Sequence, residues 1–158
     1  ETLKIQGDPD QAAQMSVEAL AEREPYEDTL PFLEYVWLRW KRAVLTNADN
    51  ASILPLLRRY RLSFDAVLTS EMVRAYKPSP TVFHRILKEI GTSPREAMYV
   101  GDSLLDDMHG ARLAGVSAVW LNRAGGEPDP DLLPPDYQVS GLEELARILD
   151  SLKGVSPR

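Results

Sequence analysis

Short apolar runs alternate with longer amphipathic stretches along this chain. The short runs predict buried strands, because a strand that is covered on both faces shows a nearly continuous apolar sequence. Apolar residues at steps of three and four predict helices instead. The predicted strands lie at 42–46, 64–70, 97–101, 116–122 and 137–140, and the predicted helices at 9–24, 28–40, 51–60, 79–91, 105–115 and 142–154.

Individual residues indicate where some of these helices begin and end. Ser79 is expected to cap a helix that opens at Pro80 and ends at Gly91. Pro55 is expected in the first turn of its helix or at a kink. One apolar face is expected on the helix at 28–40, made of Leu30, Leu33, Val36, Trp37 and Trp40.

The alternation of strands and helices predicts an α/β fold, in which helices cover both faces of a parallel sheet. Ligands bind such sheets beyond the carboxyl ends of the strands. The residues found there are Thr46 and Asn47 after one strand, Lys77 a few residues after the next, and Asp102 after the third. We therefore expect a hydroxyl, an amide, an ammonium group and a carboxylate to face one crevice.

Three aspartates, Asp102, Asp106 and Asp107, follow the third of these strands within six residues. Their charges repel one another unless a cation or a positive dipole lies among them. Carboxylates are oxygen ligands for Mg²⁺, and Lys, Thr and Asn side chains donate hydrogen bonds to phosphate oxygens. One interpretation is therefore a site for a magnesium ion and a phosphate group.

A simpler interpretation also exists for each of these residues. A residue at 102–103 would cap the helix that follows, and Asp106 and Asp107 would favour the dipole at its N-terminus. Thr46 would be an ordinary turn residue and Lys77 a solvated loop lysine. Only their order, each after its own strand, favours the metal and phosphate interpretation.

Composition narrows the function classes. The formal net charge of −6 argues against nucleic acid as the main partner, because phosphate backbones are bound by basic patches. The chain has no cysteine, which excludes disulfides and a thiol nucleophile. It shows no apolar stretch of the ~20 residues that a membrane helix needs and no basic-then-apolar leader. We therefore expect a cytoplasmic protein without a nucleic-acid or membrane partner.

Three segments closely resemble motifs of a known family. They are "AVLTNAD" at 43–49, "YKPSPTVFHRILKEIG" at 76–91 and "AMYVGDSLLDDMHGARLAGVSAVWLNR" at 97–123. These segments resemble the second, third and fourth signature motifs of the haloacid dehalogenase (HAD) superfamily, and the fourth is the most specific. The resemblance covers roughly residues 25–125. The resemblance is strongest to the phosphatase-like branch of the superfamily, in which a cap domain is inserted after the first motif.

The resemblance implies a three-layer Rossmann-like core and a small phosphorylated metabolite as substrate. By this resemblance Thr46 would bind the phosphoryl group beside Asn47, and Lys77 would neutralise the phosphate and the nucleophile.

The resemblance also implies Mg²⁺ as the cofactor. Asp102 would hold the ion, and Asp107 matches a later acidic position of the family that supports the metal directly or through water. Asp106 falls where Asn is frequent and is the weakest candidate ligand.

The first motif of the family is missing from the sequence. That motif is an apolar strand ending in Asp-x-Asp-x-Thr or Val, whose first Asp is the nucleophile and whose second is the general acid and base. Neither Asp8 nor the Asp129–Asp131 stretch fits, because neither directly follows an apolar strand. Ala12 and Leu133 stand at the positions where the Thr is expected.

The missing motif bears on the domain organisation. Residues 1–24 are expected to be a remnant of the cap or its return helix, and residues 25–158 a HAD-like core that lacks its first strand. By the topology of the family, that strand lies between those at 42–46 and 97–101. Unpaired backbone groups at such a gap cost ~1–3 kcal/mol each when buried. We therefore expect the chain alone to be inactive, and poorly folded or closed at the gap by a second chain.

The resemblance implies a two-step phosphatase reaction, in which an aspartate attacks phosphorus and water then hydrolyses the aspartyl-phosphate. A 2-haloacid dehalogenase of the same family is an alternative, but it has no use for the cation site that "GDSLLDD" resembles. A non-catalytic HAD-like pseudoenzyme or binding module is a second alternative, for which the missing motif is the only support.

Overall fold

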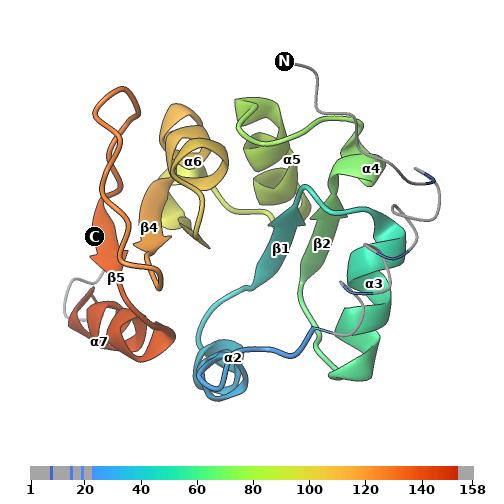
Figure 1. Ribbon diagram of the computed structural model, residues 1–158. Coiled ribbons are helices and arrows are strands. Elements are labelled where there is room, and N and C mark those ends of the chain that lie inside the picture. The colour runs from blue at the N-terminus through green and yellow to red at the C-terminus, as the bar shows by residue number, and fades with distance from the viewer. Residues whose placement is uncertain (1–7, 9–14, 16–18, 20–22, 153–158) are drawn as a thin grey trace.

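The computed structural model describes residues 8, 15, 19 and 23–152. Within this part of the chain, the strands form two parallel sheets with the orders β1-β2 and β3-β4-β5 (Figure 1). The strands are β1 (Ala43–Thr46), β2 (Ala66–Thr69), β3 (Met98–Gly101), β4 (Ser117–Leu121) and β5 (Tyr137–Val139). The predicted α/β class and the five predicted strands are confirmed.

Helices connect β1 to β4 in turn, β5 follows β4 without a helix between them, and α7 follows β5. Two short elements, α4 and the 3-10 turn η1, do not appear among the predicted helices. The helical elements are α2 (Thr29–Trp37), α3 (Asn50–Arg59), α4 (Ser70–Val73), α5 (Pro80–Glu89), η1 (Pro94–Glu96), the π-helical η2 (Leu104–His109), α6 (Gly110–Leu113) and α7 (Leu142–Leu152).

Helices cover both faces of the strands. Ala118 and Trp120 of β4 pack in one apolar cluster with residues of α5 and α6. Val119, which lies between them, packs in a second cluster with residues of α7 and with Phe32 of α2. Because neighbouring strand residues point to opposite faces, the two clusters lie on opposite sides of the sheet. Figure 1 shows α5 and α6 above the strands and α2 and α7 below them.

The break between the two sheets lies between β1 and β3. The hydroxyl of Tyr99 on β3 donates to the backbone carbonyl of Leu45 on β1 at 3.1 Å, so these two strands face each other across the break. No backbone ladder joins them within residues 23–152. The first strand that the family resemblance implies is expected at this same position, between β1 and β3.

The helix expected at 28–40 is shorter, and its expected apolar face is not the buried one. α2 ends at Trp37, and Val36 is the buried residue of the expected face. Leu30, Trp37 and Trp40 are 43%, 48% and 36% exposed. The physical reason is that α2 has apolar residues on more than one side, and the side that packs against the sheet and α7 carries Phe32.

Asp28 fixes the start of α2 to the rest of the molecule. Its carboxylate accepts a hydrogen bond from the Arg123 guanidinium at 2.7 Å and another from the backbone N–H of Leu142 at 2.8 Å. Burial opposes ionisation here, but these bonds and the charge of Arg123 hold the pKa of Asp28 below its usual value.

Three local predictions are corrected. The side chain of Ser79 makes no capping hydrogen bond, although the residue stands directly before α5. Pro55 lies in the interior of α3, beyond its first turn, so the first-turn alternative is wrong and a kink at Pro55 stays a prediction. The helix expected at 105–115 is divided, because the N–H of Met108 reaches back five residues to the carbonyl of Ser103 at 3.1 Å. This bond defines the π-helical turn η2, after which α6 continues as an α-helix.

The predictions for residues 1–24 lie almost entirely outside the described residues. These are the helix expected at 9–24 and the assignment of 1–24 to a cap remnant. In the part of the chain that the structure describes, none of the helices has the length and apolar composition needed to cross a membrane.

Candidate functional site

The carboxyl ends of β1 and β2 bring Asn47 and Lys77 together. The backbone N–H of Lys77 donates to the Asn47 side-chain oxygen at 2.8 Å, and the Asn47 amide donates to the Lys77 carbonyl at 3.3 Å. The Ser70 hydroxyl donates to the carbonyl of Asn47 at 3.0 Å. Asn47 therefore acts as a bracket that fixes the backbone of Lys77 beside the end of β1.

The ammonium group of Lys77 lies inside the site. It forms a salt bridge with Asp107 and donates a hydrogen bond to the Tyr99 hydroxyl at 3.1 Å. The side chains of Lys77 and Asp107 are only 11% and 5% exposed. The interpretation of Lys77 as a solvated loop lysine is therefore wrong.

Tyr99 joins three elements through its hydroxyl. The hydroxyl accepts from Lys77 and has two acceptors within reach of its single proton, the Leu45 carbonyl and Asp107 Oδ1, each at 3.1 Å. Burial raises the pKa of Tyr99, and the negative charge of Asp107 raises it further. The hydroxyl is therefore a neutral group that helps to hold Lys77 and Asp107 in place.

Asp107 is anchored by backbone groups as well. Its second oxygen accepts the N–H of Asp102 at 3.1 Å and the N–H of Ser103 at 3.0 Å. This contact requires glycine at position 101, because a Cβ on Gly101 would lie 2.4 Å from the carboxyl carbon of Asp107. The turn after β3 is thus built around a buried, fully engaged carboxylate.

Asp102 is the acid that faces solvent. Its side chain is exposed, and no residue in the described part of the chain hydrogen-bonds its carboxylate. Its backbone carbonyl accepts the indole N–H of Trp120 at 3.0 Å. Asp106 is half-buried, and its backbone N–H donates to the Ser103 hydroxyl at 3.1 Å.

The three aspartates therefore have different roles and do not converge. Among residues 23–152 and the few described before them, no group of three or more Asp, Glu or His side chains is placed to hold a metal ion. Asp107 pairs with Lys77 in this structure, and metal binding by Asp102, Asp106 and Asp107 stays a prediction. The exposed carboxylate of Asp102 fits a ligand to Mg²⁺, which would take its other oxygen ligands from elsewhere.

Thr46 ends β1 at the same edge. Its hydroxyl accepts the N–H of Ala48 at 3.1 Å, as a turn residue does, and its hydroxyl proton remains available to a ligand. Phosphate binding by Thr46, Asn47 and Lys77 stays a prediction, as does metal binding by Asp102.

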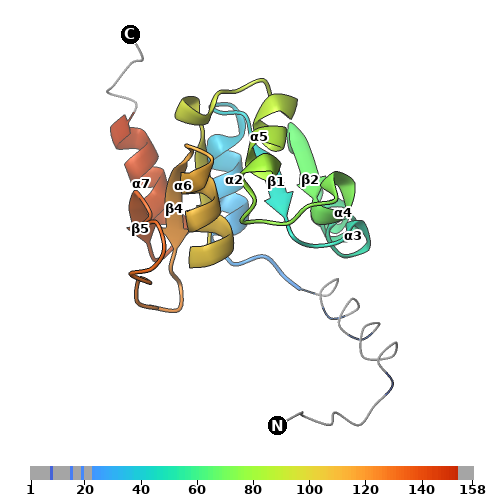
Figure 2. The same cartoon turned by 90° about the horizontal axis from the view of Figure 1, so that it is seen from above.

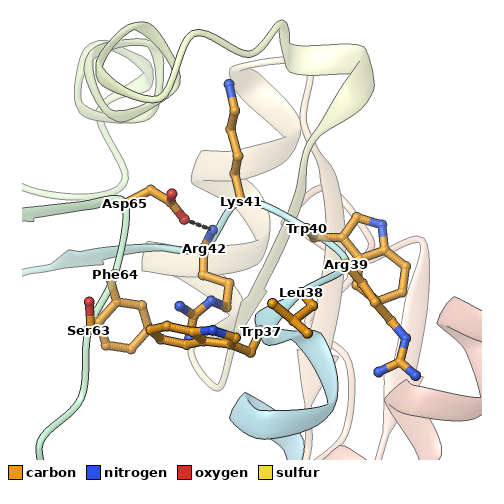
Figure 3. Close-up of a pocket in the computed structure, with 9 residues that line it drawn as sticks. All are labelled: Trp37, Leu38, Arg39, Trp40, Lys41, Arg42, Ser63, Phe64 and Asp65. Atoms are coloured by element: carbon orange, nitrogen blue, oxygen red, sulfur yellow. Dashed lines mark hydrogen bonds between the residues drawn. The ribbon is translucent and has the colours of Figure 1, made fainter.

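One pocket lies away from these residues. It has a volume of about 560 Å³ and is lined by residues that precede β1 and β2, at the amino ends of the strands. Figure 3 shows the Arg42 guanidinium stacked on the Trp37 ring there, with 4.0 Å between the guanidinium carbon and the ring centroid. Since Thr46 and Asp102 follow the carboxyl ends of their strands, this pocket is not part of the candidate site.

Two residues of the site, Tyr99 and Trp120, were not predicted from the sequence. The structure shows that Tyr99 accepts a hydrogen bond from Lys77 and that Trp120 donates one to Asp102. Both lie in apolar strand runs and read there as core residues. Their polar atoms could have indicated a role in the site, because a buried Tyr hydroxyl or Trp N–H usually has a hydrogen-bond partner.

Comparison with known proteins identifies one family. A family model described as haloacid dehalogenase-like hydrolase matches residues 8–121. Phosphoserine phosphatase from Thermus thermophilus is 35% identical over 146 residues, which cover 88% of this chain and 58% of that protein. The chain spans only 52–58% of the length of the first curated relatives that it matches.

The chain is also similar to solved structures in its three-dimensional fold. A HAD phosphatase from Thermococcus onnurineus matches with a TM-score of 0.75 and 32% identity, covering 93% of this chain and 66% of that one. A 2-haloacid dehalogenase from Pseudomonas syringae pv. Tomato DC3000 matches with a TM-score of 0.73 and 30% identity, covering 92% and 64%. The similar proteins thus include both phosphatases and dehalogenases.

Proposed function

The chain belongs to the haloacid dehalogenase-like hydrolase family, and we propose that it forms the core of a Mg²⁺-dependent phosphatase for small phosphorylated metabolites. The activity is that of the complete protein, meaning this core together with the strand that carries the nucleophile. The phosphatases among its similar proteins support the hydrolase class.

The nearly buried ammonium group of Lys77 is the observation that best supports this proposal. An ammonium group has three N–H donors, and Asp107 and Tyr99 engage two of them. The third donor is available to a phosphate oxygen at the edge where Thr46 and Asn47 also lie. A nearly buried cation of this kind stabilises negative charge more strongly than a solvated one.

In the proposed reaction, this chain binds the phosphoryl group and stabilises its charge. Lys77 and the Thr46 hydroxyl would donate to the oxygens of the transferred group. The two hydrogen bonds between the Asn47 side chain and the Lys77 backbone would hold Lys77 beside the end of β1. Mg²⁺, when bound at Asp102, would supply further positive charge. The nucleophilic aspartate would bond to phosphorus as the ester P–O bond breaks and the substrate's alcohol leaves, and water would then hydrolyse the aspartyl-phosphate to inorganic phosphate.

We propose that the nucleophile enters on a strand that fills the gap between β1 and β3. The two separate sheets support this, because no backbone ladder joins β1 and β3 within residues 23–152. The strand would come from the complete polypeptide or, as the alternative, from a second chain that closes the gap. Either source would place its end beside Lys77, because parallel strands end at the same edge.

Two other functions remain candidates. The first is 2-haloacid dehalogenation, which the similarity to the Pseudomonas syringae enzyme favours. The second is a non-catalytic HAD-like binding module. The exposed carboxylate of Asp102 favours the phosphatase over both, because neither alternative needs a metal ligand at that edge.

Replacing Asp102 with asparagine is expected to weaken Mg²⁺ binding by the complete protein tenfold or more. The change removes a charged oxygen ligand from a site that has few protein ligands, while it keeps the shape of the side chain. Calorimetric titration with MgCl₂ measures the affinity. Asp131→Asn, in an exposed loop, is the matched control and should leave it unchanged. Equal affinities in the wild type and Asp102→Asn would contradict the assignment.

A further inference from the structure

We infer that Trp120 is a positioning residue for Asp102, and that its indole N–H sets the direction of the carboxylate that binds Mg²⁺. The inference rests on the proposed function, in which Asp102 is the metal ligand of this chain. It adds a residue on β4 to a site whose other parts come from the ends of β1 and β3, the segment before α5 and η2.

The indole of Trp120 is held rigidly. Its side chain is 4% exposed and packs in the apolar cluster that includes Met108 and Phe83. In the sheet, Trp120 lies beside Gly101, the residue directly before Asp102. Its one N–H donor has one acceptor, the carbonyl of Asp102, at 3.0 Å.

The backbone of Asp102 is thus fixed from two sides. Its N–H donates to Asp107 at 3.1 Å, and its carbonyl accepts from Trp120 at 3.0 Å. The carboxylate itself has no hydrogen-bond partner in the described part of the chain. Its direction therefore depends on the backbone from which it projects, and the Trp120 bond is one of the two contacts that fix that backbone.

Loss of the indole N–H should therefore change metal binding more than it changes the fold. Phenylalanine at position 120 keeps an aromatic ring in the cluster but removes the donor, which frees the Asp102 carbonyl. Groups that orient a metal ligand in this way typically contribute 10–100-fold to metal affinity. We expect Trp120→Phe to weaken Mg²⁺ binding by about tenfold.

The test compares Trp120→Phe with Trp37→Phe in the complete protein. Trp37 is 48% exposed and lies at the amino-end pocket, so the same substitution there removes an indole without touching the site. Calorimetric titration with MgCl₂ gives the affinity, and thermal unfolding shows whether each variant is folded. Weaker Mg²⁺ binding in Trp120→Phe alone, with a cooperative unfolding transition, supports the inference; equal affinity in the two variants overturns it.

If Trp120→Phe does not fold, a second measurement on the wild type tests the role of Trp120. Addition of MgCl₂ should shift the ¹⁵N–¹H resonance of the Trp120 indole and leave that of Trp37 in place, because only the former is bonded to the ligand residue. The shift should vanish in Asp102→Asn. An unmoved Trp120 resonance at saturating Mg²⁺ overturns the inference.

The results that would contradict the positioning role and the proposed function are different. If Asp102→Asn loses Mg²⁺ binding while Trp120→Phe keeps it, only the positioning role is wrong. If Asp102→Asn binds Mg²⁺ as tightly as the wild type, the metal assignment is wrong, and the role of Trp120 falls with it.

Discussion

Replacing Lys77 with alanine should lower kcat/KM of the complete protein for p-nitrophenyl phosphate by about 10² or more. This corresponds to a loss of about 3 kcal/mol of transition-state stabilisation. The physical reason is that Lys77 is the cation at the carboxyl edge, is 11% exposed, and keeps one N–H for a phosphate oxygen. Steady-state kinetics measure the effect, with circular dichroism to confirm that the variant is folded.

Lys88→Ala is the matched control for this prediction. Lys88 lies on the exposed side of α5 and is not part of the site, so its replacement should leave kcat/KM unchanged. A loss of less than about threefold in a folded Lys77→Ala protein would show that Lys77 takes no part in phosphoryl transfer.

Replacing Asp107 with asparagine should lower the free energy of unfolding by about 3 kcal/mol or more. The side chain keeps its shape, but the ammonium of Lys77 loses the only negative charge that the described residues place against it. Removing one partner of a buried ion pair typically costs 3–5 kcal/mol, because the remaining charge stays desolvated. Such a loss is large beside the ~5–15 kcal/mol by which a whole domain is stable.

Asp106→Asn provides the comparison for Asp107→Asn. Both residues lie in η2, but Asp106 is half-buried and only its backbone is hydrogen-bonded in the described part of the chain. Its substitution should change the free energy of unfolding by less than about 0.5 kcal/mol. Urea denaturation of both variants measures this difference. Equal small losses would show that the Lys77–Asp107 pair contributes little to stability.

The positions of the strands along the chain could be predicted from the sequence because most of them are short apolar runs that alternate with helices. The position of the candidate residues followed from the same pattern, since Thr46, Lys77 and Asp102 come after successive strands. The structure places Lys77 beside Asp107 at this edge, a contact that was not predicted. The Asn47 bracket was not predicted, because a side chain that holds a distant backbone leaves no periodic signal.

Other features were predicted wrongly for identifiable reasons. Apolar spacing shows that a helix has an apolar face but not which face is covered, so Trp37 was expected inside and is 48% exposed. The π-helical turn η2 has the same residue pattern as an α-helix, and its i→i−5 bond appears only in the structure. The three aspartates read as one cluster along the sequence, whereas η2 turns Asp107 inward and the end of β3 leaves Asp102 exposed.

The most direct test of the proposed phosphatase is one assay of the complete protein with two kinds of substrate. Release of phosphate from p-nitrophenyl phosphate and of chloride from 2-chloropropionate are measured in MgCl₂ and in EDTA. We expect phosphate release that EDTA abolishes and no chloride release under either condition. The 158-residue chain alone, assayed in parallel, should release neither. Metal-independent chloride release, or phosphate turnover by a monomeric 158-residue chain, would contradict the account.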